Sequence, residues 1–154
     1  MTVINKKRNA FLLLGGGVLT VYIAWWFSRP VKIVAIHEDG HFSSVLVKSF
    51  PFTTRGKIEW WLQHKDMLKE RYDIPKPASY GDFSVNFWLF GDGYKEEGKY
   101  DRLCFDDMKT RVNCIEKDIV FSVSKSKNLG VVFFTDGGIY RIDKNGKVAK
   151  VNID

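Results

Sequence analysis

The sequence predicts an α+β protein, in which one N-terminal transmembrane helix is followed by an antiparallel sheet of about six or seven strands packed with one helix. Three observations predict this class. A run of eighteen uncharged residues lies near the N-terminus, a single amphipathic segment follows, and the remaining chain consists of short apolar runs separated by turn sequences. Because 45% of the residues are hydrophobic, the chain can form a packed core.

The uncharged run, AFLLLGGGVLTVYIAWWF at residues 10–27, is long enough for a membrane anchor. A helix of this length spans about 27 Å, close to the roughly 30 Å of a bilayer's hydrocarbon core. Trp25 and Trp26 lie near its end, where indole rings favour the headgroup level, and Pro30 then ends the helix. A cleaved secretory signal and a buried soluble helix are the alternatives. The bulky Trp-Trp-Phe end is a poor cleavage site, so we expect an uncleaved anchor.

The charges beside this run predict its orientation. Residues 1–9 form a tail with three basic residues, Lys6, Lys7 and Arg8, and no carboxylate. The positive-inside rule therefore favours a cytoplasmic tail and a periplasmic domain at residues 31–154 in a Gram-negative cell, and two basic residues beyond the run make this bias modest. The whole chain has a net charge of +6, but the domain is nearly neutral, so we expect no nucleic-acid partner.

A hairpin and a helix follow the anchor. Two β-branched, apolar runs at residues 31–38 and 41–50 are separated by Asp39-Gly40, which is a strong hairpin signal. Residues 53–72 then form the one soluble helix. A threonine can cap its start, and the DIPKP segment that follows it cannot continue a helix.

The rest of the chain is predicted to form strands. DFSVNFWLF has one wholly apolar face and one half-apolar face, as a central strand does. A polar loop and a short strand follow it, and the C-terminal third is a meander with turns at Asp-Gly and Asn-Gly pairs. These strands cover residues 82–90, 102–107, 118–125, 129–135, 138–143 and 147–153.

The soluble helix carries a candidate partner-binding stripe. On a helical wheel, the predicted core face consists of Ile58, Trp61, Leu62, Leu68 and Tyr72. A further stripe, roughly opposite this face, consists of Trp60, His64, Met67 and Arg71. Trp, Met and Arg are enriched where proteins bind proteins, so the stripe can be an exposed partner-binding patch. The alternative is that a loop, such as the proline-containing link, covers it.

The chain has two cysteines, Cys104 and Cys114. An even number of cysteines in an exported domain most often forms a disulfide. Zinc needs three or four ligands, and no histidine lies near this pair in the sequence. We therefore predict a disulfide between Cys104 and Cys114, which depends on the predicted export of the domain.

The sequence predicts neither a metal site nor a catalytic site. His37 and His41 flank the first turn, but two ligands alone rarely hold a metal, so we expect surface histidines. No nucleophile elbow, zinc-protease motif or phosphate-binding loop is present, and we expect no enzyme activity, no cofactor and no small-molecule substrate. An acidic run lacks the spacing of an EF-hand and is expected to be a solvated loop. It consists of Asp92, Glu96, Glu97, Asp101, Asp106 and Asp107.

Two blocks of the sequence resemble a known family. HEDGHFSSVLVKSFPFTTRGKIEWWLQHKDMLKERYDIPKP and FWLFGDGYKEEGKYDRLCFDDMKTRVNCIEKD are similar to the enterobacterial putative membrane protein family, a domain of unknown function. The likeness covers essentially the whole chain. It implies a small inner-membrane protein of enteric bacteria with one N-terminal span, and it supplies no catalytic residues.

These features predict a non-enzymatic binding protein that is anchored in the inner membrane and faces the periplasm. Within this class we favour an immunity protein that neutralises a toxin acting in the periplasm or on the inner membrane. The reasons are the single anchor, the small disulfide-closed domain and the lack of a catalytic motif. The alternative is an accessory subunit or envelope-stress factor that binds another membrane protein.

Overall fold

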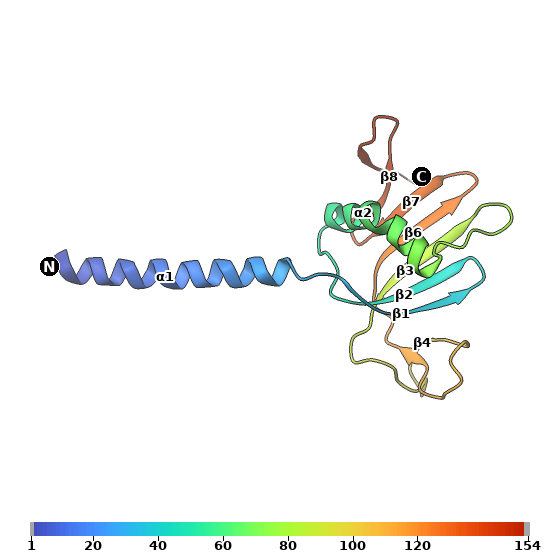
Figure 1. The fold of residues 1–154 in the computed structure, drawn as a ribbon, viewed down its shortest axis with the longest axis horizontal. Helices are drawn as coiled ribbons and strands as arrows, with labels where there is room; N and C mark the ends of the chain where they lie inside the picture. The colour runs from blue at the N-terminus through green and yellow to red at the C-terminus, as the bar shows by residue number, and fades with distance from the viewer. Residues whose placement is uncertain (1, 153–154) are drawn as a thin grey trace. The chain divides into compact units, whose positions relative to one another are not determined.

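Figure 1 shows the computed structural model, which describes residues 2–152. The chain divides into two compact units, Met1–Pro30 and Val31–Asp154. The described elements confirm the α+β class, with an apolar N-terminal helix, a second helix and a seven-stranded sheet. The first residue of the predicted tail and the last two residues of the predicted domain lie outside the described residues.

The helix α1 (Thr2–Phe27) forms the first unit. Within the described chain it is the one helix long and apolar enough to cross a membrane, over Asn5–Trp26, which corresponds to about 33 Å. The basic residues of the predicted tail lie within this helix rather than before it. At its other end, the Arg29 guanidinium lies 4.3 Å from the ring centroids of both Trp25 and Trp26. A cation over an indole face is attracted to it, and this pairing suits the interface of a bilayer.

The second unit is built on the seven-stranded sheet. Its neighbouring strands pair antiparallel, with one exception: β2 and β3 are parallel. This pair was not predicted from the sequence. It arises because the second helix, α2 (Thr54–Tyr72), connects the end of β2 to the start of β3 and so returns the chain in the same direction. In spatial order the strands are β1 (Lys32–Asp39), β2 (Phe42–Lys48), β3 (Phe83–Leu89), β6 (Ile119–Ser126), β7 (Gly130–Thr135), β8 (Gly138–Ile142) and β9 (Val148–Lys150).

The predicted hairpins are confirmed. The β1–β2 hairpin turns through Gly40 and His41, between the paired residues Asp39 and Phe42, so its turn lies one residue beyond the predicted pair. The β7–β8 hairpin turns between the paired residues Thr135 and Gly138, and β9 pairs with β8 after the Asn-Gly turn. Gly40 has a φ of 60°, a left-handed conformation that glycine adopts without the steric cost of a side chain. Local turn chemistry therefore determines these three connections.

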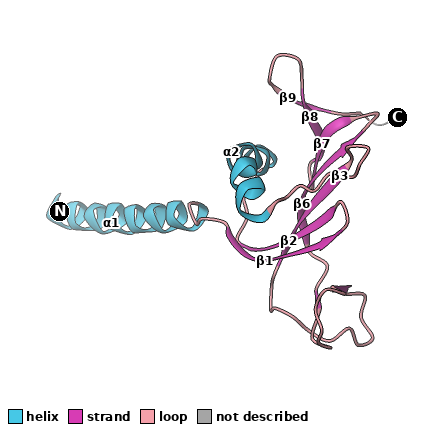
Figure 2. Cartoon of the chain, turned by 45° about the vertical axis from the view of Figure 1, so that its right-hand side comes forward, coloured by secondary structure: helices cyan, strands magenta, loops and turns pink. Residues whose placement is uncertain are grey.

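The helix α2 lies over one face of the sheet (Figure 2). Thr53, one of the two threonines considered as a cap, accepts a hydrogen bond of 3.0 Å from the Gly56 N–H through its side-chain oxygen. The helix ends at Asp73, which is left-handed with a φ of 54° and donates its N–H to carbonyls of the last turn. Both ends of α2 are thus capped by the residues beside it.

The main core lies between α2 and the sheet, with Phe87 of β3 at its centre. The ring centroid of Phe87 lies 5.2 Å from Phe50, 5.6 Å from Trp60, 6.2 Å from Trp61 and 5.7 Å from Phe121. Offset and edge-to-face aromatic pairs at such distances add to the free energy gained from burial. The other buried members of this core are Val45, Val47, Ile58, Leu68, Ile74, Val85, Val123 and Phe133.

The prediction of the core face of α2 is wrong in part. Ile58, Trp61 and Leu68 are buried as expected, whereas Leu62 and Tyr72 are 39% and 38% exposed. A helical wheel shows how apolar side chains spread around the axis, but it does not show which part of the spread faces the sheet. In the structure the buried arc is rotated toward the stripe that was predicted to lie opposite the core.

An ion pair between a buried lysine and an exposed aspartate joins the start of α2 to the β7–β8 turn. The Lys57 side chain is only 7% exposed, and its Nζ lies 3.0 Å from a carboxylate oxygen of Asp136. The Thr54 and Thr135 hydroxyls lie 3.2 Å apart beside it, and a Cβ added at Gly137 would lie 2.8 Å from the Thr54 oxygen. The turn therefore packs closely on the helix, and a residue larger than glycine at 137 would separate them.

We expect Asp136→Asn to destabilise the domain at neutral pH and to reduce the effect of acid on its stability. The hydrogen bond from Lys57 and the charge of Lys57 lower the pKa of Asp136 below its ordinary value of 3.8. A carboxyl group whose pKa is lower when folded stabilises the protein above its ordinary pKa, and this contribution disappears as the pH falls through the lowered pKa.

The measurement is the thermal unfolding of the full chain in detergent micelles at a series of pH values between about 2 and 7. The wild type should lose more stability than Asp136→Asn on going below about pH 4. Glu70→Gln, which neutralises an exposed carboxylate on α2, is the matched control and should follow the wild type. If the melting temperatures of wild type and Asp136→Asn change equally with pH, the Lys57–Asp136 pair does not contribute to the stability of the domain.

The opposite face of the sheet is partly covered by residues 91–118, which we call the disulfide module. It connects β3 to β6, which are neighbouring antiparallel strands, and contains β4 (Leu103–Cys104) and β5 (Cys114–Ile115). A second, smaller core forms where Phe105 and Ile115 of this module pack on Leu46 of β2. The sheet is therefore covered by α2 on one face and by the module at one end of the other.

Candidate functional site

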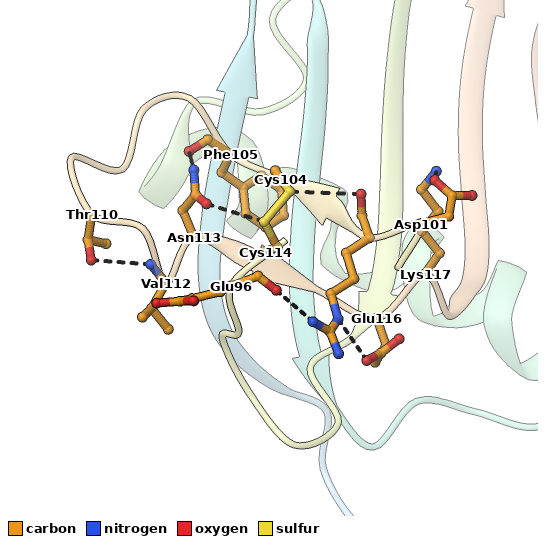
Figure 3. Close-up of a disulfide and its surroundings, with 11 residues drawn as sticks. Glu96, Asp101, Cys104, Phe105, Thr110, Val112, Asn113, Cys114, Glu116 and Lys117 are labelled. Atoms are coloured by element: carbon orange, nitrogen blue, oxygen red, sulfur yellow. Dashed lines mark hydrogen bonds and ion pairs between the residues drawn. A yellow bond between two sulfur atoms is a disulfide. The ribbon is translucent and has the colours of Figure 1, made fainter. Parts of the chain in front are cut away.

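The structure contains the predicted disulfide. Cys104 and Cys114 are bonded and are directly opposite each other in the β4–β5 pair, with their Cα atoms 4.0 Å apart (Figure 3). Beside the bond, the Phe105 N–H donates to the Asn113 carbonyl, and the Asn113 side-chain amide donates to the Phe105 carbonyl, both at 3.0 Å. The short strands are thus closed by a covalent bond and by local hydrogen bonds.

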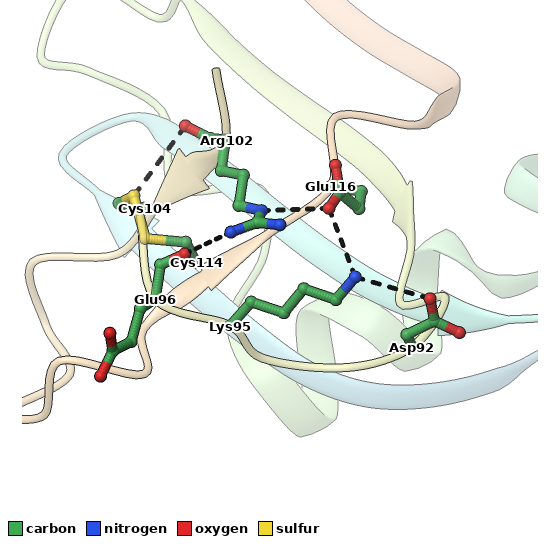
Figure 4. A network of polar contacts seen from close by, with 7 residues as sticks. All are labelled: Asp92, Lys95, Glu96, Arg102, Cys104, Cys114 and Glu116. Carbon is green, nitrogen blue, oxygen red and sulfur yellow. Dashed lines mark hydrogen bonds and ion pairs between the residues drawn. A yellow bond between two sulfur atoms is a disulfide. The ribbon is translucent and has the colours of Figure 1, made fainter. Parts of the chain in front are cut away.

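Ion pairs brace the module on its outer side. Glu116 lies at the centre, 3.0 Å from the Arg102 Nε and 3.4 Å from the Lys95 Nζ (Figure 4). The hydrogen bond from Arg102, with the nearby charges of Arg102 and Lys95, lowers the pKa of Glu116. Lys95 also pairs through its backbone with Cys114, by N···O distances of 2.7 and 3.0 Å. Exposed ion pairs contribute little individually, but this network holds three parts of the module together.

A chain of hydrogen bonds ties the module to the sheet. The Nδ1 of His37, on β1, lies 2.8 and 2.9 Å from the two carboxylate oxygens of Asp107, and its Nε2 lies 2.8 Å from the Tyr94 hydroxyl. Because an ionised carboxylate only accepts, Nδ1 carries a hydrogen, and in a neutral imidazole Nε2 then accepts from Tyr94. Burial and the charge of Asp107 raise the pKa of Tyr94, which keeps its hydroxyl protonated.

His37 was expected to be a surface histidine, and this was wrong. It is only 8% exposed, and its ring stacks on Phe105 at a centroid distance of 3.9 Å. Its polar partners are 57 and 70 positions away in the sequence, so no local pattern could have identified them. The one available signal was its place on a predicted strand. Asp107, in turn, is the member of the predicted solvated acidic loop that is bound to the sheet.

A pocket of about 310 Å³ lies where the module meets the β1–β2 hairpin. Its walls combine aromatic side chains, the buried His37 and several carboxylates, and one of the disulfide cysteines lies in its lining. The lining residues are His37, Glu38, Asp39, Phe42, Ser44, Leu103, Cys104, Phe105, Asp106 and Asp107. We call this hollow the module pocket.

A second hollow, of about 430 Å³, lies on the other face of the sheet, between α2, the proline link after it and β7–β8. We call it the helix groove. Trp61 and Phe133, both buried, form part of its lining, and three half-exposed apolar side chains also line it: Leu62 at 39%, Val131 at 39% and Ile142 at 36% exposure. The charged residues in the lining are Lys65, Asp66 and Lys69. Such an apolar hollow with a polar rim is typical of a surface that binds another molecule.

The predicted partner-binding stripe is only partly accessible. Trp60 and Met67 are half-buried and pack against the main core, where Trp60 contacts Phe50 at a centroid distance of 5.3 Å. His64 stacks on Trp60 at 4.4 Å, and of the four residues only Arg71 is exposed. Trp60 is therefore half-buried by core residues, which include Phe50 in the segment between β2 and α2. Whether the stripe contacts a partner stays a prediction.

No group of three or more His, Cys, Asp or Glu side chains within residues 2–152 is arranged to hold a metal ion. His37 and His41, the pair considered in the sequence, have different surroundings. His41 lies beside Phe42 and Tyr80, at ring centroid distances of 4.2 and 6.0 Å, while His37 is bound to the module.

The structure thus defines a class of protein: a small α+β domain, closed by one disulfide, that follows a single N-terminal candidate membrane span. The chain belongs to the enterobacterial putative membrane protein family (DUF943), whose model matches residues 4–152. Comparison with curated proteins and with solved structures gives no match. Family membership confirms the resemblance found in the sequence.

Proposed function

We propose that this protein is a non-enzymatic, membrane-anchored domain that binds another protein on the periplasmic side of the inner membrane. Within this class we favour an immunity protein, which would occlude a toxin acting in the periplasm or on the inner membrane. The observation that carries the binding role is the helix groove, an apolar hollow that the chain itself leaves unfilled.

The helix groove supports protein binding through the apolar side chains that line it. Leu62, Val131 and Ile142 keep more than a third of their surface in water, although each lies next to the buried core. An apolar side chain inserted between them would remove this surface from water, at about 25 cal/mol for each Å². A groove of this kind accepts one or two anchor residues of a partner, which is how a few side chains supply most of the affinity of an interface.

The periplasmic location is supported by three independent features. The candidate span carries three basic residues in its first turns, which favours retention of that end in the cytoplasm. The domain that follows contains a disulfide, and such bonds persist in oxidising compartments. The family itself is enterobacterial, so the host has a periplasm in which thiols are oxidised.

The test is site-specific photocrosslinking in the enteric host, with benzoylphenylalanine placed at Leu62 of the full chain. We expect one discrete adduct, because Leu62 lines the helix groove and is partly exposed to solvent. The adduct should be lost when Ile142→Asp puts a charge into the groove. It should persist with Phe134→Asp, because Phe134 is similarly exposed, at 38%, but lies on a strand position that faces the other side of the sheet.

The identity of the adduct separates the candidate functions. A toxin of the same strain supports the immunity role, and its expression should kill cells that produce the Ile142→Asp variant but not cells that produce the wild type. A resident subunit of the inner membrane supports the alternative role of an accessory or envelope-stress factor. If Leu62 gives no adduct beyond those obtained from a probe at the exposed Lys127, the helix groove is not a protein-binding site.

The sequence-predicted stripe is a further proposed contact surface. Trp60→Ala is a poor test of it, because Trp60 packs on Phe50 and Phe87 and its removal would also disturb the core. Arg71 is exposed and can be truncated without such a loss. A partner that contacts the stripe should therefore be crosslinked by a probe at Arg71.

A further inference from the structure

We propose that the module pocket binds a positively charged group on an aliphatic stem, with the arginine side chain of a peptide as its occupant. The pocket lies between the disulfide module and the face of the sheet that α2 does not cover. It is therefore separate from the helix groove, and this inference does not depend on the protein-binding role proposed for that groove.

The shape and the walls of the pocket fit such a group. Its volume of about 310 Å³ is that of a small ligand site. Phe105 and His37, stacked at 3.9 Å, form one aromatic wall, and Phe42 adds a second aromatic ring that is 51% exposed. A planar guanidinium stacks on aromatic rings, and the methylene groups of its stem pack on apolar walls.

The charge of the lining selects a cation. Four carboxylates line the pocket, and two of them already have a polar partner: Glu38 forms an ion pair with the Lys76 Nζ at 2.6 Å, and Asp107 accepts a hydrogen bond from His37 at 2.8 Å. Asp39 and Asp106 have no ion-pair partner among the described residues. An incoming guanidinium can accordingly pair with these carboxylates while its stem contacts the aromatic walls. The carboxylates and the aromatic side chains together therefore favour an arginine side chain.

The pocket is also preorganised. Cys104 lies in its lining and is held by the disulfide, and His37 is held by hydrogen bonds at both ring nitrogens. Because these groups are already fixed in the free protein, a ligand pays little of the ordering cost that weakens binding to flexible loops. Asp107, bound to His37, joins the disulfide module to β1 beside the pocket.

The experiment is an NMR titration of the full chain in detergent micelles, with N-acetyl-arginine methylamide as the probe. The control ligand is its uncharged analogue, N-acetyl-citrulline methylamide, which has nearly the same shape. We expect saturable shifts of the amide signals of residues 37–44 and 103–107 with the arginine compound alone. In Asp39→Asn/Asp106→Asn, the affinity should fall by about fivefold or more, because both unpaired carboxylates are gone.

The matched control is Glu70→Gln/Glu97→Gln, which changes the net charge equally at two exposed residues outside the pocket and should bind like the wild type. Three results would overturn the proposal. They are equal shifts with the citrulline compound, equal affinity of Asp39→Asn/Asp106→Asn and wild type, and no saturable shift up to about 50 mM probe. The spectrum of each variant without probe shows whether it has kept the fold, so that loss of binding is not confused with unfolding.

Discussion

Replacing both cysteines, in Cys104→Ser/Cys114→Ser, is expected to lower the melting temperature of the domain by about 10 °C. The bond closes a loop between residues ten positions apart, and the chain-entropy relation assigns about 2.8 kcal/mol to a loop of this size. Little else can replace it, because β4 and β5 are only two residues long. The module should loosen first, since its ion pairs are exposed and contribute little.

Thermal unfolding in detergent micelles and hydrogen exchange of residues 103–115 measure this effect. Exchange should become faster in the module, while the central strand β3 should retain its protection. Chemical reduction of the wild type is the matched control, because it breaks the same bond without a substitution. Unchanged melting and exchange in both cases would mean that the disulfide does not stabilise the module.

The state of the same thiols in living cells tests the orientation of the chain. With the domain in the periplasm, Cys104 and Cys114 should resist alkylation until a reductant is added. A variant without residues 1–30 should remain in the reducing cytosol, and both of its thiols should react. If both thiols of the full chain also react before reduction, the domain is not exported, and the proposed periplasmic role is wrong.

Phe87→Ala is expected to cause the largest loss of stability, about 3–5 kcal/mol, or a melting temperature lower by about 12–20 °C. Phe87 is completely buried, and its ring contacts aromatic side chains from the sheet, from α2 and from the segment before α2. Its removal leaves a cavity at the point where these elements meet, and the rigid surroundings cannot close it. This loss is a large part of the roughly 5–15 kcal/mol that stabilises a typical domain.

The control for this prediction is the same substitution at Phe134, which is 38% exposed and lies on the opposite face of the sheet. Phe134→Ala should cost much less than Phe87→Ala, because the Phe134 ring already lies partly in water. Phe87→Leu, which refills much of the volume, should recover part of the loss. Similar melting temperatures for both alanine variants would show that the core is not centred on Phe87.

Much of the fold was predictable because its signals are local. The Asp39-Gly40 turn, the threonine cap of α2 and the apolar alternation of β3 each depend on a few adjacent residues. The parallel pairing of β2 with β3 was not predictable in this way, because strand direction depends on where α2 returns the chain. A sequence pattern shows that an element exists, but it does not show which neighbour the element will have.

The candidate sites were less predictable for the same reason. The partners of His37 come from a segment far along the chain, and the helix groove combines α2, the proline link and β7–β8. The residues of each site are therefore brought together only by tertiary structure. The cysteine pair is the exception, because two cysteines allow only one intramolecular pairing.

The position of the disulfide module has a consequence for how this family can diversify. Its two ends meet at the base of β3 and β6, where the Leu89 N–H donates to the Asp118 carbonyl at 2.9 Å. The two strands pair directly with each other from that point on. Substitutions in this segment can therefore accumulate without disturbing α2 and its core, because the module packs in a separate cluster of buried residues.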